Sequence, residues 1–418
     1  MTIRRLGIFK HPLILPFYLP ALLIATSEAV LFPVLPLYVK ALESSYGLIG
    51  LMLAGEGLGL LLGDIPSGLL LRHLGQKHTM LLGTGCMAVS VLALAWCEST
   101  IVALLLRLIA GLGASLYGVA RHAYIAEAAA TASRGRSISL LGGLFRAGRL
   151  IGPLLGGTVA TAWGLRAAFV AFSLLQLGAL LLIVRFVPAA QGRRLSVSVH
   201  APRRPLWYTI KARWRVLTAA GLGQVFAQTI RAGRPVIIPL YAADVLGMDV
   251  QAIGLLESIA STVDMAIFYP AGWIMDRWGR KWAVVPCFAI QAIGMALVPL
   301  TGTPIGLLLA MTIISLGNGL GSGIMLTIGA DLAPSESRGE FLGLWRFIGD
   351  GGSSGGPLIV GWVADLVALP TAAWAMAAAG LISAAIFALF VPETLVKTPH
   401  QALVQTSPIC KAEELTAD

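Results

Sequence analysis

The chain has 418 residues, of which 57% are hydrophobic and only 12% are charged, and its mean hydropathy is +0.83. Soluble domains carry about 25% charged residues, so the composition excludes a soluble globular protein and indicates helices in a lipid bilayer. A net charge of +10 is compatible with a nucleic-acid partner or with a membrane protein whose basic loops lie on one face. The placement of the basic residues distinguishes the two.

Apolar stretches of about 20 residues, long enough to cross a bilayer as helices, recur over the whole chain. They predict twelve transmembrane helices with no soluble domain between them. In chain order, the predicted spans are residues 14–39, 47–71, 79–96, 101–127, 137–162, 166–187, 213–241, 251–275, 282–300, 304–330, 341–366 and 370–391. The predicted fold class is therefore an all-α membrane protein.

The basic residues are distributed unequally between the two predicted membrane faces. Most Lys and Arg lie in the N-terminus, in the loops on its side and in the C-terminal tail, whereas the opposite loops carry only Lys40 and Arg166. Because positive loops stay on the cytoplasmic face, we expect a multi-pass protein of the plasma (inner) membrane with both termini cytoplasmic. The basic charge then reflects topology, and no nucleic-acid partner is expected.

An internal repeat relates the two halves of the chain at an offset of 204 residues. Residues 50–188 align with residues 254–392 without a gap, and the identities concentrate in Gly, Pro and loop residues, as in Pro66 with Pro270. Six helices in each half make the halves parallel repeats, with a substrate site between them near the membrane midplane. The predicted units are a six-helix bundle at 1–187, a cytoplasmic linker at 188–212, a second bundle at 213–392 and a cytoplasmic tail at 393–418.

The segment at residues 272–281 reads GWIMDRWGRK and resembles the G-x-x-x-D-R-x-G-R-K signature of the major facilitator superfamily. The resemblance implies the major facilitator fold, with 12 transmembrane helices in two pseudo-symmetric halves, and a latch that holds one conformation. Glycines in such a motif would let helices approach closely. The first-half copy departs from the signature, because Arg72 occupies the acidic position and Asp64 lies two turns earlier. The expected latch residues are Asp64, Gly68, Arg72, Gly75, Gly272, Asp276, Arg277, Gly279 and Arg280.

Residues 148–157 read GRLIGPLLGG and resemble the G-x-x-x-G-P-x-x-G-G motif of drug:proton antiporters in the same superfamily. Small residues four apart permit close helix packing, and a proline bends the helix. The resemblance implies export rather than uptake, while generic packing of membrane helices is the alternative explanation of the pattern. The motif residues are Gly148, Gly152, Pro153, Gly156 and Gly157.

Ionisable residues inside the spans are candidates for proton coupling, because a charge in the bilayer is costly without a partner or a function. Glu28 is the first choice, since it is the deepest on a helix expected to line the cavity. The alternative is a permanent ion pair of Glu28 with an arginine of the fourth or seventh helix. Arg107, followed by Gly111 and Gly113, is similar to the family's R-x-x-x-G-x-G element, which is linked to proton coupling. The candidates are Glu28, Glu56, Arg107, Glu257 and Asp264.

Polar residues of the spans also indicate a substrate cavity shared by both halves. In the repeat, Glu28 occupies the position equivalent to Arg231, and Arg146 the position equivalent to Asp350. Because arginine suits carboxylate and phosphate, we expect an anionic or zwitterionic amphipathic substrate; alternatively, the arginines pair with the acids and leave little net charge. The expected lining residues are Glu28, Arg146, Arg149, Gln224, Gln228, Arg231, Asn318, Arg346 and Asp350.

Together these patterns predict a secondary active transporter that works by alternating access and is not an enzyme. The preferred interpretation is proton-coupled efflux (antiport) of a small amphipathic substrate, either drug-like or an anionic metabolite or siderophore. An uptake symporter or uniporter on the same fold is the alternative, and a membrane-embedded lipid-handling protein is the alternative of another class. The sequence shows no metal-ligand spacing and no phosphate loop. We therefore expect a monomer driven by the proton gradient, without cofactor or metal, whose partners are the substrate, protons and the bilayer.

Overall fold

The computed structural model describes residues 13–42, 45–128, 134–188, 206–334 and 338–395, and these ranges contain helices and no strand. The first described element is a short π-helix, η3 (Ile14–Tyr18). The α-helices are α1 (Leu19–Val30), α2 (Leu35–Leu42), α3 (Tyr46–Leu94), α4 (Thr100–Ala128), α5 (Arg134–Trp163), α6 (Leu165–Phe186), α7 (Leu206–Asp244), α8 (Val250–Arg277), α9 (Lys281–Leu297), α10 (Pro304–Leu320), α11 (Ile324–Leu332), α12 (Arg338–Leu366) and α13 (Leu369–Leu389), and a 3-10 turn, η4 (Val298–Leu300), follows α9.

These helices confirm the predicted twelve spans, although three spans differ from simple rods. The first span bends by 42° between α1 and α2. The second and third spans run together as α3, which is kinked at Gly75, where φ is 75° and only glycine is unstrained. The tenth span breaks between α10 and α11, where Gly323 adopts a φ of 72°.

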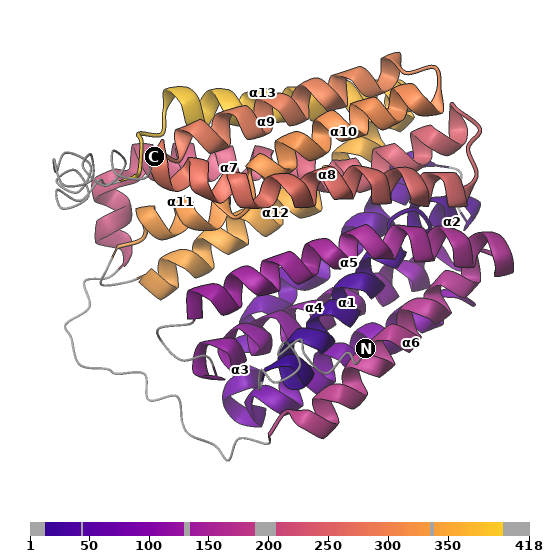
Figure 1. The fold of residues 1–418 in the computed structure, drawn as a ribbon, viewed down its shortest axis with the longest axis horizontal. Coiled ribbons are helices and arrows are strands. Elements are labelled where there is room, and N and C mark those ends of the chain that lie inside the picture. Colours follow the sequence, from indigo (N-terminus) through magenta and orange to yellow (C-terminus); the bar gives the residue numbers. More distant parts are fainter. Residues whose placement is uncertain (1–12, 43–44, 129–133, 189–205, 335–337, 396–418) are drawn as a thin grey trace, which may run out of the picture.

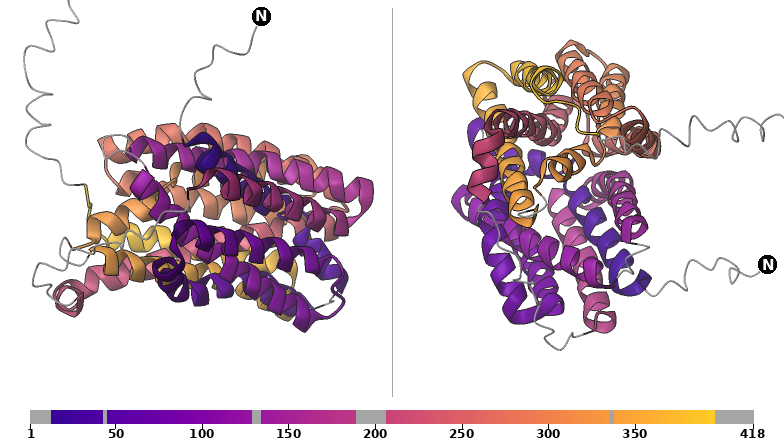
Figure 2. Two further views of the ribbon diagram at one scale, coloured as in Figure 1. Left: turned by 90° about the horizontal axis from the view of Figure 1, so that it is seen from below. Right: turned by 90° about the vertical axis from the view of Figure 1, so that its left-hand side faces the viewer.

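The helices form two groups that meet lengthwise, as the end-on view in Figure 2 shows. A hydrogen bond within the first group recurs within the second group, between residues that are 204 positions further along the chain. Lys77 Nζ donates to the Val184 carbonyl at 2.8 Å, and Lys281 Nζ donates to the Ala388 carbonyl at 2.8 Å. The two halves of the chain therefore share detailed packing as well as sequence, while the predicted domain boundaries remain predictions.

Two structural features lie at the predicted boundaries. The helix α7 begins at Leu206, inside the predicted linker 188–212, and residues 189–205 lie outside the described ranges. The predicted tail begins at Glu393, but Glu393 is tied to the helix ends by hydrogen bonds from the backbone N–H groups of Arg280 (2.8 Å) and Lys281 (3.0 Å). Residues 396–418 lie outside the described ranges.

The halves touch along two symmetry-related helix pairs, α3 with α12 and α5 with α8. Glycines allow this approach, because a Cβ at Gly50 would lie 3.1 Å from Gly361 Cα, and one at Gly254 would lie 3.3 Å from Gly157 Cα. These contacts lie toward the end of the bundle that carries α2, at the right of Figure 1. We name this the far end, and the opposite end, where α13 finishes, the terminal end.

Polar groups add to the closure of the far end. Asp365 of α12 accepts hydrogen bonds from the backbone N–H groups of Tyr46 and Gly47, both at 2.7 Å, and so caps the start of α3 from the other half. Asp244 of α7 pairs with Lys40 and accepts a hydrogen bond from the Tyr46 hydroxyl at 2.6 Å. The far end is thus held by inter-half packing and hydrogen bonds together.

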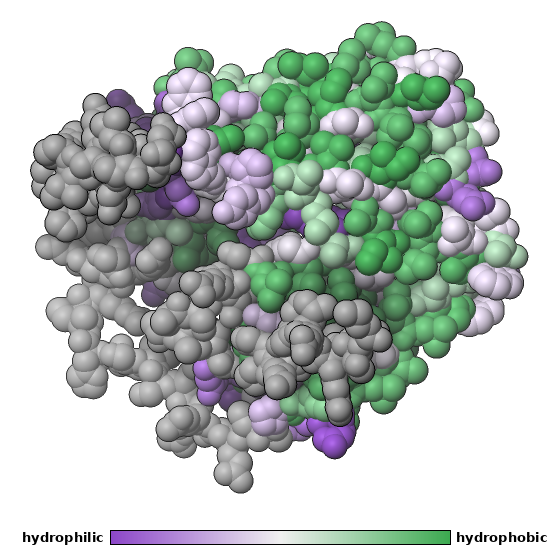
Figure 3. All heavy atoms as spheres, in the orientation of Figure 1, coloured by the Kyte–Doolittle hydropathy of each residue, from purple (hydrophilic) through white to green (hydrophobic). Residues whose placement is uncertain are grey.

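The outer surface is apolar along the helices. Figure 3 shows a broad hydrophobic surface over the middle of one face, with hydrophilic residues toward its two ends. Large side chains stand fully outward, among them Ile65 (76% exposed), Ile101 (72%) and Tyr269 (85%). An apolar surface of this extent suits lipid rather than water.

Candidate functional site

Two adjoining cavities lie between the halves. The larger, of about 490 Å³, is lined mainly by α5, α7, α8 and the α10–α11 break, and we name it the C-lobe. The smaller, of about 330 Å³, is lined mainly by α1, α3 and α4, and we name it the N-lobe. Both lobes share a wall made of Phe32, Arg149, Ala232, Pro235 and Ser353. The lobes therefore form one site that draws residues from both halves, as the parallel repeat predicts.

The glycines at 148–156 position Glu28. A Cβ at Gly148 would lie 2.7 Å from the backbone of Ala25, and one at Gly152 would lie 2.7 Å from the backbone of Ala29, so α1 and α5 pack backbone to backbone on either side of Glu28. This antiporter-like motif thus performs the close packing that its spacing suggests. Its last glycine, Gly157, packs instead on α8 of the other half.

The N-lobe holds Glu28, Glu56 and Arg107 together. Arg107, which is 5% exposed, forms an ion pair with Glu56. The Glu28 carboxylate has no hydrogen bond or ion pair with any residue that the structure describes, although it lines the cavity. The alternative of a permanent ion pair between Glu28 and an arginine of the fourth or seventh helix is therefore not what the described part of the chain contains.

The C-lobe holds two buried carboxylates, each bound to an arginine. Asp264 lies 3.6 Å from Arg146 and accepts a hydrogen bond from the Asn318 amide at 2.9 Å. Glu257 lies 3.0 Å from Arg234. Pairing of this kind is what a low-dielectric site demands of buried charges.

Arg146 crosses from the first half to the second. Its guanidinium donates to the Ser322 hydroxyl at 2.6 Å and lies 4.6 Å from the ring centroid of Phe268. It therefore joins α5 both to α8 and to the α10–α11 break, so the cavity is also a place where the halves are held together.

Two arginines of the site have no acidic partner in the described ranges. Arg231 donates to the Gly321 carbonyl at 3.1 Å and lies over the Phe288 ring, 5.0 Å from its centroid. Arg149 lies in the shared wall, with the Phe32 ring centroid 5.9 Å away. Because the other arginines are paired, these two carry the uncompensated positive charge of the cavity.

Gln228 and Asn318 line the C-lobe as expected, but three predicted cavity residues lie elsewhere. Gln224 is 3% exposed and lines neither lobe. Arg346 and Asp350 also lie outside the lobes. Arg346 is 3.2 Å from Asp64 of the first half and 3.5 Å from Asp350 of its own helix.

Asp64, one of the expected latch residues, therefore makes an inter-half contact, and its partner is Arg346 rather than Arg72. Asp64 Oδ1 also accepts a hydrogen bond from the Ser115 hydroxyl at 2.7 Å. Arg72 itself is exposed on α3. An ion pair thus bridges α3, before its kink at Gly75, and α12 on the terminal side of the N-lobe.

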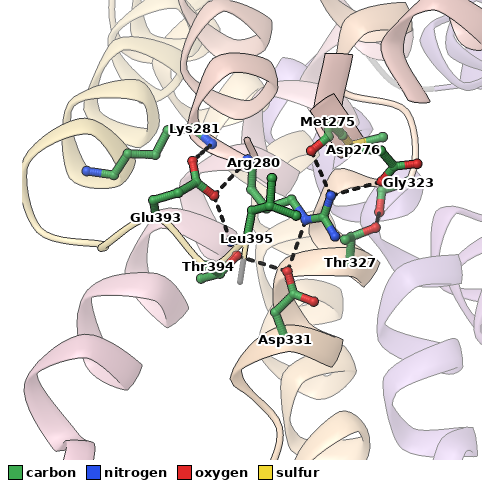
Figure 4. Close-up of polar contacts among 10 residues, drawn as sticks. All are labelled: Met275, Asp276, Arg280, Lys281, Gly323, Thr327, Asp331, Glu393, Thr394 and Leu395. Atoms are coloured by element: carbon green, nitrogen blue, oxygen red, sulfur yellow. Dashed lines mark hydrogen bonds and ion pairs between the residues drawn. The ribbon is translucent and has the colours of Figure 1, made fainter. Parts of the chain in front are cut away.

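The second-half signature forms a polar cluster at the terminal end, drawn in Figure 4. Arg280 is its centre, with Asp331 at 3.1 Å, Asp276 at 3.0 Å and the Met275 carbonyl at 2.7 Å. Asp276 is 81% exposed. Arg277 is exposed and lies over the Trp273 ring, 5.2 Å from its centroid.

Two of the four signature glycines serve the backbone rather than helix packing. Gly279 and its repeat partner Gly75 have φ values of 126° and 75°, a region that favours glycine. A Cβ at Gly68 or Gly272 would meet no atom within 4 Å. Close helix approach, the expected reason for these glycines, is therefore not seen at any of the four positions. A Cβ at Gly279 would meet the Glu393 side chain, which is not part of a helix.

Several site residues were not among the predicted ones. Arg234 continues the polar stripe of Gln228 and Arg231 on α7, so the stripe was the available signal. Ser322 becomes accessible only because the tenth span breaks at a glycine-rich segment, a break that composition alone does not locate. Within the described ranges, no group of three His, Cys, Asp or Glu could hold a metal ion.

Comparison with known proteins identifies the family. The sequence profile described as Major Facilitator Superfamily matches residues 17–231 and 220–411. The multidrug resistance protein MdtH of Aeromonas hydrophila is 26% identical over 346 residues, which cover 78% of this chain and 81% of MdtH. The uncharacterized MFS-type transporter MJ1560 of Methanocaldococcus jannaschii is 21% identical over 338 residues, or 81% and 87% of the two chains. The crystal structure of a D-xylose-proton symporter matches the fold with a TM-score of 0.75 at 19% identity, covering 94% of this chain and 99% of the symporter.

Proposed function

Since the chain belongs to the major facilitator superfamily and is a multi-pass membrane transporter rather than an enzyme, we propose that it exports a small amphipathic substrate in exchange for protons. The observation that carries this proposal is the Glu28 carboxylate, which faces the cavity without an ion pair in the described part of the chain. A carboxylate in that position can take up and release a proton without breaking a salt bridge.

The other acids suit a different role. Glu56, Glu257 and Asp264 each lie within 4.0 Å of an arginine, and protonating any of them would leave a positive charge unpaired in the site. Arg107 holds Glu56 in place, so this arginine acts on Glu28 only from a distance. We assign Glu28 as the proton carrier, and Arg107 with Glu56 as the pair that fixes its surroundings.

The contrast between the contacts at the two ends supports alternating access as the mechanism. Opening the far end requires separation of the Gly50–Gly361 and Gly254–Gly157 contacts and release of α3 from Asp365. On the terminal side, the links between the halves are polar, namely Asp64 with Arg346 and Arg146 with Ser322. We propose that the terminal end faces the cytoplasm of a plasma membrane and opens when these polar links break, in a protein that works as a monomer.

Two observations favour export over uptake. Residues 148–157 carry the antiporter-like motif and place α1 against α5 at Glu28. Several relatives of similar length are named multidrug resistance proteins. The presence of Arg149 and Arg231 in the cavity without an acidic partner supports a substrate with an anionic group, such as a drug-like amphipath, a carboxylate-rich metabolite or a siderophore.

Reconstituted protein in liposomes tests the proposal, with Nε-dansyl-lysine as a fluorescent amphipathic probe. An acidic lumen should drive accumulation of the probe in the lumen as protons leave. Glu28→Gln should abolish this drive while exchange at equal pH continues. Glu98→Gln, which neutralises an exposed acid outside the cavity, is the matched control. Accumulation driven by an acidic exterior instead would establish symport, and full drive in Glu28→Gln would remove Glu28 as the carrier.

A further inference from the structure

Three charges of the site remain after every ion pair in the described ranges is assigned. Glu28 lines the N-lobe, Arg231 lines the C-lobe, and Arg149 lies in the wall that they share. The paired residues cancel one another, so these three side chains decide which charges a substrate must carry. They provide one site for a cation and two for an anion in the two adjoining lobes.

Arg231 is held ready for an anion by neutral groups alone. Its contacts are the Gly321 carbonyl at 3.1 Å, the Cys287 sulfur at 3.7 Å and the Phe288 ring. Its Nε–H is buried and has no hydrogen-bond acceptor. A guanidinium that lines the cavity and contacts only neutral groups has no carboxylate to compensate its positive charge, which can therefore attract an incoming carboxylate or phosphate.

The sign of proton coupling restricts the substrate further. An anion bound near Glu28 stabilises the protonated form of that carboxyl, and by reciprocity the proton then favours anion binding. Such a pair travels together, which is symport. A cation displaces the proton, as antiport requires, but a simple cation is repelled by Arg149 and Arg231. A substrate with both charges satisfies the site and the coupling together.

Resting on the export function proposed above, we propose that the substrate is a zwitterionic amphipath. Its ammonium group binds the Glu28 carboxylate and displaces the proton to solvent, while its anionic group binds Arg231 and Arg149. The O–H bond of the protonated Glu28 carboxyl breaks and its proton passes to a solvent water, so that the ammonium charge takes the place of the proton at the carboxylate.

The groups around Glu28 do not alter this assignment. Those that face it from the neighbouring helices are Glu56 of α3, Arg107, Tyr117 and Arg121 of α4, and Arg149 of α5. Glu56 and Arg107 are paired with each other. Arg121 lies between the Tyr117 and Phe145 rings, 5.5 and 4.6 Å from their centroids. Glu28 is thus the acid of this group that remains available to an ammonium ion.

Three probes of similar size but different charge test the proposal. They are Nε-dansyl-lysine, a zwitterion; dansylcadaverine, a cation; and dansyl-6-aminohexanoate, an anion. Binding to the purified full-length protein at constant pH is followed by dansyl fluorescence. The zwitterion should bind at least about tenfold more tightly than either singly charged probe, a difference of about 1.4 kcal/mol.

Two variants should show opposite losses. Glu28→Gln should lower zwitterion affinity to that of the anionic probe and leave the anionic probe bound at least as tightly as before. Arg231→Gln should lower zwitterion affinity to that of the cationic probe without weakening the cation. Glu98→Gln and Arg166→Gln, at exposed positions outside the lobes, are the charge-matched controls and should change nothing. General misfolding cannot produce this crossed pattern, because it would weaken every probe.

The proposal is overturned if a singly charged probe binds as tightly as the zwitterion, if the zwitterion does not bind, or if the crossed losses are absent. The binding test needs no gradient and no direction of transport. If the protein binds the zwitterion selectively but takes it up with protons, the export proposal is rejected and the zwitterion proposal stands. If the protein instead exchanges the cation or the anion for protons, the export proposal stands and the zwitterion proposal is rejected.

Discussion

Neutralising Asp64 should loosen the terminal side of the site. Asn in place of Asp64 keeps an oxygen that accepts the Ser115 hydrogen bond of 2.7 Å, but it removes the charge that faces Arg346 across the two halves. We expect Asp64→Asn to shift the conformational equilibrium toward the state with the terminal end open.

The magnitude follows from the geometry of the pair. Arg346 Nη2 lies 3.2 Å from Asp64 Oδ1, and the side chains are 38% and 19% exposed. Exposed pairs contribute about 0.2–1 kcal/mol, and loss of one partner of a buried pair costs about 3–5 kcal/mol. This half-buried pair lies between those limits, and Arg346 retains Asp350 in the variant. An effect of about 1–2 kcal/mol, or a factor of about 5–30 in the population ratio, is expected.

Distances between spin labels at Leu74 and Glu340 measure this population. Both side chains are exposed toward the terminal end, one in each half, in a variant whose four native cysteines are replaced. The long-distance population should grow in Asp64→Asn and return when Asp64→Arg is combined with Arg346→Asp. Glu98→Gln is the control for loss of one negative charge. An unchanged distance distribution in Asp64→Asn would refute the reasoning.

Three further predictions concern packing, a buried charge and acid stability. Gly152→Ala should lower the melting temperature and slow transport, because its Cβ would lie 2.7 Å from the Ala29 backbone and overpacking costs about 1–3 kcal/mol; Gly143→Ala on the same helix, with no atom within 4 Å, should be nearly neutral. Glu257→Gln should destabilise the protein by about 3–5 kcal/mol in denaturant unfolding, because it leaves the Arg234 charge without its partner at 3.0 Å. At the terminal end, burial acts to raise the pKa of Glu393, but hydrogen bonds from backbone N–H groups outweigh it and hold the pKa below its usual range. Its stabilisation is therefore present above the unfolded pKa of about 4.3 and is lost as pH falls through the lower folded pKa, so Glu393→Gln should flatten the acid limb of a melting-temperature profile.

Each of these predictions has an opposing outcome. Equal melting temperatures for Gly152→Ala and Gly143→Ala would mean that α1 and α5 can separate without loss. Full stability of Glu257→Gln would mean that water or another acid neutralises Arg234. An acid limb of the same slope in Glu393→Gln would assign the acid sensitivity to other carboxylates.

The sequence predicted much of the fold because its signals are strong ones. Apolar runs of membrane length, loop charges and a gap-free repeat lead directly to twelve spans in two related halves. The structure adds that equivalent residues of the two halves make equivalent contacts, as the matching carbonyl acceptors of Lys77 and Lys281 show. Two details were not predicted. The second and third spans continue as one kinked helix, α3, where a loop was expected. The tenth span breaks at Gly321–Gly323, inside an apolar run that gives no sign of a break.

The site was predicted as a set of residues but not as a set of pairs. The predicted spans place Asp64, Arg346 and Asp264 in the membrane, but which of them pair depends on the distances between helices that are far apart in sequence. Asp64 therefore found Arg346, some 280 residues away, rather than the nearby Arg72. The uncompensated state of Glu28 and Arg231 emerges only when all the other pairs are known.

Proton release on substrate binding tests the central claim most directly. Purified protein in weakly buffered solution, mixed with Nε-dansyl-lysine at a pH where Glu28 is protonated, should release protons to the medium. Glu28→Gln should bind the probe without release, and Glu98→Gln should behave as the parent protein. Proton uptake, or binding to the parent protein with no change in pH, would contradict exchange of substrate and proton at Glu28.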